Sequence, residues 1–396
     1  MQKKIAILLL LFFYAGFLYS QEDTLQAGSI HDSQLNVLQR MKLKREMKIR
    51  EGRLMITPFI APGYTPELGL TFAGGALVSF KTDKKDPLMK RTSIPISISY
   101  STRKSLVFSS QLTSYWMHDK LRINGDFWYK DMPDNYWGIG YENAVEIPKS
   151  DSTTEYTRRW WWMNPRFLFL VADNFYLGAS VDYNYTRGRK PSAGVANDPY
   201  YQKYNDRPMN GGLGFIIRYD SRDIPVDARK GMYINFTSTF YSKYFGGDND
   251  YQVYMVDYRQ YKTIRRDGRT LTWQLKTRFG SGSIPYGEMA QLGTPFDLRG
   301  YIWGHYRDRN MAFAILEYRH MFWRKKKQKL SKSGLVGWFA GGTIFHQWEK
   351  TTDVNRWLPN IGIGYRLEVQ PRMMARVDLG FGRNTKGFYF NFYQAF

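Results

Sequence analysis

The chain has 396 residues, a formal net charge of +22, no cysteine and an aromatic content of 17%. Without cysteine it cannot build a disulfide scaffold, a cysteine-ligated metal or haem site, a thiol nucleophile or a lipidated N-terminal cysteine. Its length suits two or three soluble domains or one large barrel.

The first twenty residues are typical of a secretory signal peptide. Lys3 and Lys4 precede an apolar run from residue 5 to residue 18, and polar residues follow. We therefore expect export of the chain and removal of residues 1–20. No later stretch offers the ~18 apolar residues that a membrane-spanning helix needs, so a membrane location would require β-strands.

Residues 21–53 carry no strand pattern, and we expect them to form a short periplasmic segment. Within it, residues 31–50 are compatible with a helix because Leu35, Leu38 and Met41 recur at a spacing of three, and the end of this stretch is strongly basic. Two interpretations stay open. The segment is either a solvated lead-in or a short helix at or inside the periplasmic mouth of a barrel.

From Leu54 onwards, apolar and polar side chains alternate with the period of two that β-strands have. Leu271, Trp273 and Leu275 are apolar, for example, whereas Thr272 and the other residues between them are polar. One lipid-facing side and one wet side are typical of transmembrane strands. A soluble β-sandwich is the alternative, but the aromatic residues near the segment ends favour the girdles of a membrane barrel.

Counting these segments predicts an all-β fold, a closed transmembrane antiparallel β-barrel of about sixteen strands. An even number of strands places both chain ends on one side. The long connections 132–153, 191–207 and 283–307 lie on one side and tight turns on the other, so we expect a bacterial outer-membrane barrel with a periplasmic N-terminus. The expected strands are 54–61, 68–82, 91–102, 105–117, 119–131, 154–171, 174–190, 208–220, 231–245, 250–265, 269–282, 308–321, 332–347, 356–370, 373–383 and 387–396, the last of which ends on Phe396.

The connection 283–307, here called loop six, is longer than an ordinary hairpin turn and contains the sequence Leu298, Arg299, Gly300, Tyr301. At this position, between the eleventh and twelfth strands, these residues resemble the loop-six motif of the BamA/TamA outer-membrane assembly and translocation superfamily, also labelled bacterial surface antigen. The resemblance extends over residues 54–396. Further stretches that carry it are 64–70, 136–140, 219–223 and 363–366.

In that family the loop-six arginine folds back into the barrel lumen and pairs with acids on the twelfth and thirteenth strands. The resemblance implies that Arg299 is this arginine and that Glu317 is its partner on the twelfth strand. The acid of the thirteenth strand is missing because Ala340 stands in its place. Asp378 and Glu368 are the less favoured alternative partners.

A seam between the first and last strands is the feature that could act without a catalytic residue. The first strand contains Pro58, and a proline removes a donor from the strand ladder, so we expect weak pairing with the last strand. An exposed strand edge can template an incoming strand, which is how the family is thought to insert new barrels. We expect the seam to be lined by Leu54, Ile56, Pro58 and Ile60 on one side and by Phe388, Phe390, Phe392 and Phe396 on the other, with Ile56 close to Phe392.

The resemblance implies a non-enzymatic barrel that assists the insertion or translocation of proteins, or of lipid, without a cofactor or a metal. Its expected partners are unfolded outer-membrane proteins and outer-membrane lipids including lipopolysaccharide, and nucleic acid is excluded because an exported chain seldom meets it. The family carries polypeptide-transport-associated (POTRA) domains that residues 21–53 cannot hold, so we expect a separate periplasmic partner to replace them. A passive pore or structural barrel without assembly activity is the alternative.

Overall fold

The structure is a computed structural model that describes residues 43, 47–48, 51–86, 89–324, 329–370, 373–392 and 394–396. The expected signal peptide, residues 1–20, lies outside the described residues. So does the stretch 31–50, apart from residues 43, 47 and 48, which are helical. In the part of the chain that is described, no helix is long and apolar enough to cross a membrane.

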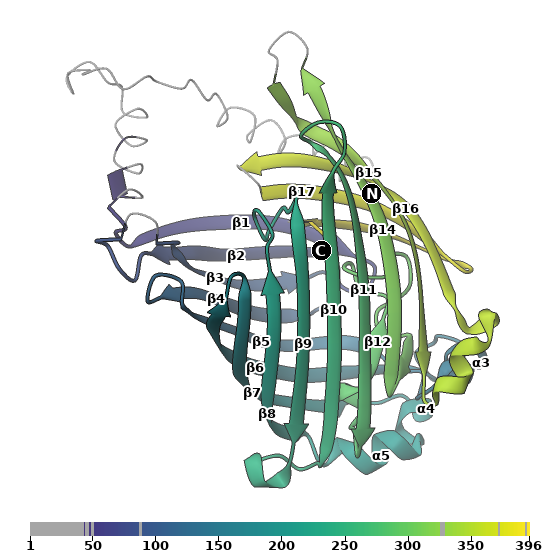
Figure 1. Ribbon diagram of the computed structural model, residues 1–396. Helices are drawn as coiled ribbons and strands as arrows, with labels where there is room; N and C mark the ends of the chain where they lie inside the picture. Colours follow the sequence, from purple (N-terminus) through teal and green to yellow (C-terminus); the bar gives the residue numbers. More distant parts are fainter. Residues whose placement is uncertain are drawn as a thin grey trace, which may run out of the picture. The chain divides into compact units, whose positions relative to one another are not determined.

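Residues 51–396 form a closed antiparallel β-barrel (Figure 1). Sixteen strands of the described chain make the wall, as predicted. Each pairs with its neighbour in sequence, except that β11 pairs with β14 and that β1 pairs with β18 to close the barrel. The wall strands are β1 (Met55–Thr65), β2 (Gly69–Phe80), β3 (Thr92–Ser101), β4 (Leu106–Trp116), β5 (Leu121–Asn135), β6 (Glu155–Ala172), β7 (Phe175–Arg189), β8 (Met209–Asp220), β9 (Gly231–Tyr241), β10 (Tyr251–Thr263), β11 (Arg269–Gly282), β14 (Asn310–Arg324), β15 (Lys329–Phe345), β16 (Leu358–Gln370), β17 (Met373–Gly382) and β18 (Thr385–Phe392).

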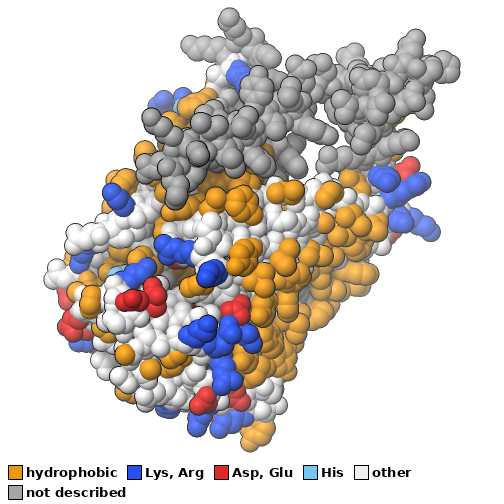
Figure 2. Space-filling model, turned by 180° about the vertical axis from the view of Figure 1, so that it is seen from behind, with side chains coloured by type: hydrophobic (Ala, Val, Ile, Leu, Met, Phe, Trp, Pro, Cys, Tyr) orange, Lys and Arg blue, Asp and Glu red, His pale blue; other side chains and the backbone are white. Residues whose placement is uncertain are grey.

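The alternation along each strand separates an apolar outer face from a polar inner face. On β14, Leu316 is 47% exposed, whereas the next residue, Glu317, is completely buried in the lumen. Figure 2 shows hydrophobic side chains gathered over a wide area of the outer wall, with charged side chains beside it. The wall therefore has the two-faced pattern of a membrane barrel.

The longest connections lie at one end of the barrel, here called the loop end, and the opposite end is called the turn end. At the loop end, buried tyrosines pack together, among them Tyr136, Tyr156, Tyr201 and Tyr286. The connections there contain short elements: α3 (Tyr141–Glu146), α4 (Ala193–Ala196), α5 (Pro199–Asn205), the 3-10 turns η2 (Lys243–Phe245), η3 (Tyr286–Glu288), η5 (Trp348–Thr352) and η6 (Val354–Arg356), and a small hairpin of β12 (Ala290–Leu292) with β13 (Tyr306–Asp308).

The two seam strands differ from expectation in their ends. The first strand is longer than expected because β1 continues to Thr65. The last strand, expected to run to Phe396, ends at Phe392. Ala395 and Phe396 are buried instead, and Arg319 Nη2 donates to the backbone oxygen of Phe396 at 2.9 Å. A polar lumen can bind backbone groups of a segment that leaves the wall, so Phe396 packs inside the barrel and not along the seam.

Candidate functional site

Loop six turns back into the lumen. Just before Arg299 the chain makes a short turn that the side chain of Asp297 stabilises. The carboxylate of Asp297 accepts hydrogen bonds from the backbone amides of Gly293 (2.9 Å) and Thr294 (2.7 Å) and from the Thr294 hydroxyl (2.7 Å). Burial raises the pKa of Asp297, and these hydrogen bonds oppose the rise. The neighbouring Leu298 and Tyr301 pack in a buried cluster with residues of β14–β16. Local capping and apolar packing thus fix the loop on both sides of Arg299.

Arg299 is completely buried and contacts two acids at once. Its Nη2 donates to Glu317 Oε2 at 2.7 Å, and its Nη1 donates to Asp378 Oδ2 at 3.0 Å. The guanidinium also lies 3.5 Å from the centre of the Trp338 ring. Charge-assisted bonds and a desolvated cation–π contact are among the stronger polar interactions in proteins. Loop six is therefore held by one side chain that touches β14, β15 and β17.

The second acid comes from β17, the fifteenth wall strand. Ala340 on β15 is buried at the position where the family resemblance implied an acid, and Asp378 supplies a carboxylate from two strands further along. Glu368 is not a partner of Arg299 among the described contacts. Asp378 thus supplies the second carboxylate that Arg299 binds, and the small side chain of Ala340 stands where the resemblance implied an acid.

The acids are shared with three further arginines. Arg319 Nε donates to Glu317 at 2.8 Å, and Asp378 accepts from Arg366 at 2.6 Å and from Arg376 at 3.1 Å. The described cluster therefore holds four guanidinium groups and two carboxylates, all of them nearly or fully buried. The period of two predicts the inward direction of Arg366 and Arg376, but their sharing of an acid with Arg299, and the contact of Arg319 with Glu317, were not predicted from the sequence.

Gly300 allows the chain to pass close to the wall. Its φ is +119°, and a Cβ at this position would lie 2.7 Å from the backbone oxygen of Gly380. Both features exclude a side chain at this residue. The Gly300 amide donates to the hydroxyl of Tyr389 on β18 at 2.9 Å, and Thr385 Oγ1 donates to the Gly300 carbonyl at 2.7 Å.

Loop six also contacts the turn between β1 and β2 and the inner face of β5. The Trp303 amide donates to Glu67 Oε1 at 3.2 Å, and Glu67 lies in the turn between β1 and β2. The Lys130 ammonium lies 4.6 Å from the Trp303 ring, 4.9 Å from Trp128 and 4.8 Å from Trp160. Nothing in the sequence pattern identified Trp303 as a contact residue. The loop thus joins β18 and the turn between β1 and β2 to β5 and β6.

A second buried acid of loop six, Glu288, lies near the loop end. Thr186 Oγ1 donates to Glu288 Oε1 at 3.3 Å. Burial, reinforced by Asp182 and opposed by Arg278, raises the pKa of Glu288 from its ordinary 4.5 to about 7. This carboxyl therefore changes its charge close to neutral pH.

The seam is the weakest junction of the described wall. Its one register pair joins Tyr64 to Phe390, whereas every residue of β1 from Met55 to Thr65 pairs with β2. This register places Pro62 opposite Phe392, so residues 55–61 extend past the end of β18 and, on the side that faces the seam, have no strand partner among the described residues. Ile56 and Ile60 are 63% and 75% exposed. The expected neighbours Ile56 and Phe392 therefore do not lie opposite each other, because the two strands are shifted by several residues.

Comparisons with known proteins give four results. The chain matches the family described as "Omp85 superfamily domain" over residues 90–396. BamA from Haemophilus ducreyi lacking POTRA domains 1–3 superposes with a TM-score of 0.55 at 14% identity, covering 85% of this chain and 70% of that one. CdiB from Acinetobacter baumannii superposes with a TM-score of 0.51 at 12% identity, covering 93% and 70%. No curated protein matches in sequence. The structural likenesses show the fold.

Proposed function

This chain belongs to the Omp85 superfamily, and from that premise we propose that it assists the insertion or translocation of proteins through the seam between β1 and β18. The fold and the family indicate a bacterial outer membrane. The proposed orientation has the N-terminus and the turn end in the periplasm and the loop end outside. This work requires no catalytic residue, because the reactive element is a backbone edge.

The observation that carries the proposal is the register of the seam. One register pair joins β1 to β18 in the described chain, whereas β1 pairs with β2 along its whole length. A ladder hydrogen bond stabilises by a net ~1 kcal/mol, so separating the seam costs far less than separating β1 from β2. The free edge of residues 55–61 can then bind an incoming strand by β-augmentation.

Loop six supports this proposal because it contacts β18 and the turn that follows β1. Gly300 binds Tyr389 of β18, and Trp303 binds Glu67 next to β1. Arg299 anchors the same loop to β14 and β17. We propose that the anchored loop keeps the seam closed at the loop end. The edge of residues 55–61, near the turn end, stays available to an incoming strand.

The proposed substrates are unfolded outer-membrane proteins, with lipid as a second class of cargo, and a separate periplasmic partner delivers them. A passive pore is the competing function. Loop six and Phe396 both pack inside the lumen beside β14–β16, which favours a controlled barrel over an open channel.

The proposal is tested by quantifying the outer-membrane proteome after depletion of this protein. Three strains carry the wild-type chain, Arg299→Ala or the control Lys350→Ala, a change at an exposed loop residue. We expect depletion to lower one or several surface proteins, Arg299→Ala to reproduce that loss and Lys350→Ala to restore normal levels. An unchanged proteome after depletion would contradict assembly and favour a pore or structural barrel.

A further inference from the structure

Strands β5, β6 and β7 present a row of aromatic side chains on the outer face near the loop end. On β6, Trp162 points inward because its Nε1 donates to Asp182 at 2.8 Å, so the adjacent Trp161 points outward. Trp161 lies opposite Tyr129 on β5 and opposite Tyr185 on β7. The Trp161 and Tyr185 rings stack at 6.4 Å with planes 4° apart. Aromatic rows of this kind mark the interface of a membrane barrel.

The length of the apolar band below this row agrees with that assignment. Along β6 the outward residues from Trp161 to Val171 are apolar. These ten residue steps span ~33 Å along a strand, which is ~25 Å along the membrane normal at a tilt of ~40°. The apolar band of such barrels is ~25 Å tall. Trp161 therefore marks one edge of the hydrocarbon region, and residues beyond it face the headgroup layer, which is ~5–7 Å deep.

Beyond the aromatic row the outward side chains become basic. Arg159 lies directly opposite Arg187, and Arg189 follows one row further along β7. Like charges that face each other across a ladder are destabilising unless an anion lies between them. The face therefore carries a pair that needs a counter-ion.

The local acids neutralise these arginines incompletely. Arg189 Nη2 donates to both carboxylate oxygens of Asp131 at 2.6 Å. Arg159 Nη2 lies 3.4 Å from Oδ2 of the same carboxylate. The nearest acid to Arg187 is Asp206, at 3.7 Å, and the Asp206 side chain is 84% exposed. One carboxylate thus serves two guanidinium groups, and Arg187 has only a loose, solvated partner.

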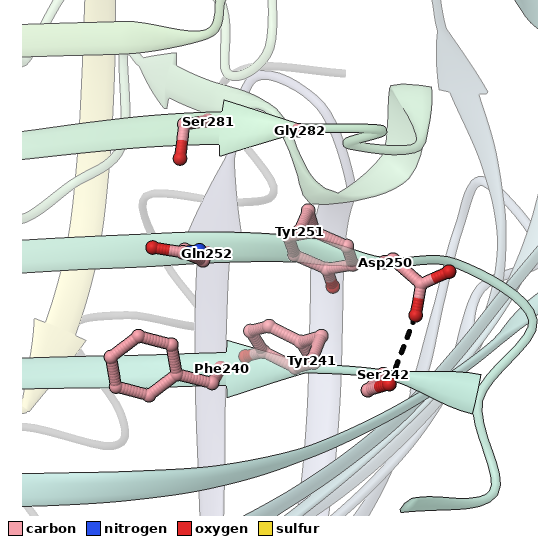
Figure 3. A pocket seen from close by; sticks show the side chains of 8 residues that line it. All are labelled: Phe240, Tyr241, Ser242, Asp250, Tyr251, Gln252, Ser281 and Gly282. Carbon is pink, nitrogen blue, oxygen red and sulfur yellow. Dashed lines mark hydrogen bonds between the residues drawn. The ribbon is translucent and has the colours of Figure 1, made fainter. Parts of the chain in front are cut away.

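A hollow of about 290 Å³ opens between these side chains and is lined by Arg159, Arg187 and Arg189 together with Tyr185 and Asn205. We call it the arginine hollow. A second hollow, of about 240 Å³, lies on β9–β11 and is shown in Figure 3. No basic residue lines it, and its one acid, Asp250, accepts a hydrogen bond from Ser242 Oγ at 2.9 Å. Of these two hollows, the one on β6 and β7 has the basic lining.

We propose that the arginine hollow binds the phosphate monoester of a glycolipid in the outer leaflet, with the acyl chains on the apolar band below. A phosphate monoester carries a charge of about −1.5 to −2 at pH 7, and the planar fork of arginine matches its oxygens. The ligand would lie between Arg159 and Arg187 and remove their repulsion. This inference rests on the orientation in the proposed function, in which the loop end faces outward.

The test is the affinity of the purified full chain, in detergent micelles, for bisphosphorylated lipid A. The variant carries Arg159→Gln with Arg187→Gln, and the matched control carries Lys243→Gln with Lys350→Gln, which removes the same charge from the loop end outside the hollow. Heat-modifiable mobility on gels verifies that each barrel is folded. We expect at least a tenfold weaker affinity in the arginine variant and an unchanged affinity in the control.

Two further ligands test which part of the glycolipid the arginine hollow recognises. Chemically dephosphorylated lipid A should bind the wild-type chain at least tenfold more weakly, and inorganic phosphate at millimolar concentration should not displace the lipid. Equal binding of bisphosphorylated lipid A by the arginine variant would overturn the site. Equal binding of the dephosphorylated lipid would overturn phosphate recognition, and displacement by inorganic phosphate would overturn the lipid as ligand. Since the assay measures lipid binding and not assembly, its outcome is independent of the depletion experiment.

Discussion

Arg299→Ala is the substitution whose effect follows most directly from the structure. It removes the guanidinium that binds Glu317 at 2.7 Å and Asp378 at 3.0 Å. Breaking a buried ion pair by deleting one partner typically costs about 3–5 kcal/mol. Arg319 and Arg366 still neutralise the two acids after the change, so we expect the lower end, about 3 kcal/mol. The loss falls on the docking of loop six, because the other partners belong to the wall.

A loss of about 3 kcal/mol raises the population of the undocked loop roughly a hundredfold. Amide hydrogen exchange of residues 290–308, followed by mass spectrometry, measures that population. Arg299→Lys keeps the charge but loses the two-pronged geometry, so exchange should be intermediate. Lys386→Ala, a change at an exposed residue of β18, serves as the control. Unchanged exchange of residues 290–308 in Arg299→Ala would refute the anchoring role.

Three further outcomes follow from the same geometry. Gly300→Ala should undock loop six to a similar extent in the exchange measurement, because its φ is +119° and the added Cβ would lie 2.7 Å from the Gly380 oxygen; normal protection would contradict this. Tyr389→Phe removes the hydroxyl that accepts from the Gly300 amide and donates to the Tyr301 carbonyl, and should weaken docking by about 1 kcal/mol, which a roughly fivefold rise in exchange would show and unchanged exchange would contradict. The raised pKa of Glu288 makes the folded chain bind more protons than the unfolded chain between pH 4.5 and about 7, so its contribution to stability falls as pH rises through that window. Glu288→Gln should therefore stabilise the chain by up to about 3 kcal/mol at pH 8 and by little at pH 4.5, and equal melting temperatures of both forms at pH 8 would contradict the assignment.

The strands could be predicted from the sequence because a two-sided wall imposes a period of two on every segment. The helix α5 was missed although its signal is local: Asp198 caps it by accepting from the Tyr201 amide at 2.7 Å, and Pro199 occupies its first turn. Such caps are easily overlooked in a chain that otherwise alternates.

The residues that surround Arg299 were harder to predict than the strands. Alternation shows that Asp378 faces the lumen, but which inward side chains meet depends on the closure and stagger of the barrel, which no single segment encodes. The same stagger places Pro62, and not Ile56, opposite Phe392, as the pairing of Tyr64 with Phe390 shows. Periodicity therefore predicts faces, whereas long-range register comes only from the folded wall.

The central claim is that the seam must open for function, and a disulfide across the observed register tests it most directly. Tyr64→Cys with Phe390→Cys joins the paired residues of β1 and β18, and Phe72→Cys with Tyr100→Cys, a register pair on β2 and β3, is the matched control. Each pair replaces the wild-type chain in the depletion strain, and surface protein levels are measured before and after reduction. We predict that the oxidised seam variant fails to restore those proteins while its barrel remains folded, that reduction restores them, and that the control functions in both states. Full restoration by a verified, oxidised seam cross-link would contradict the account.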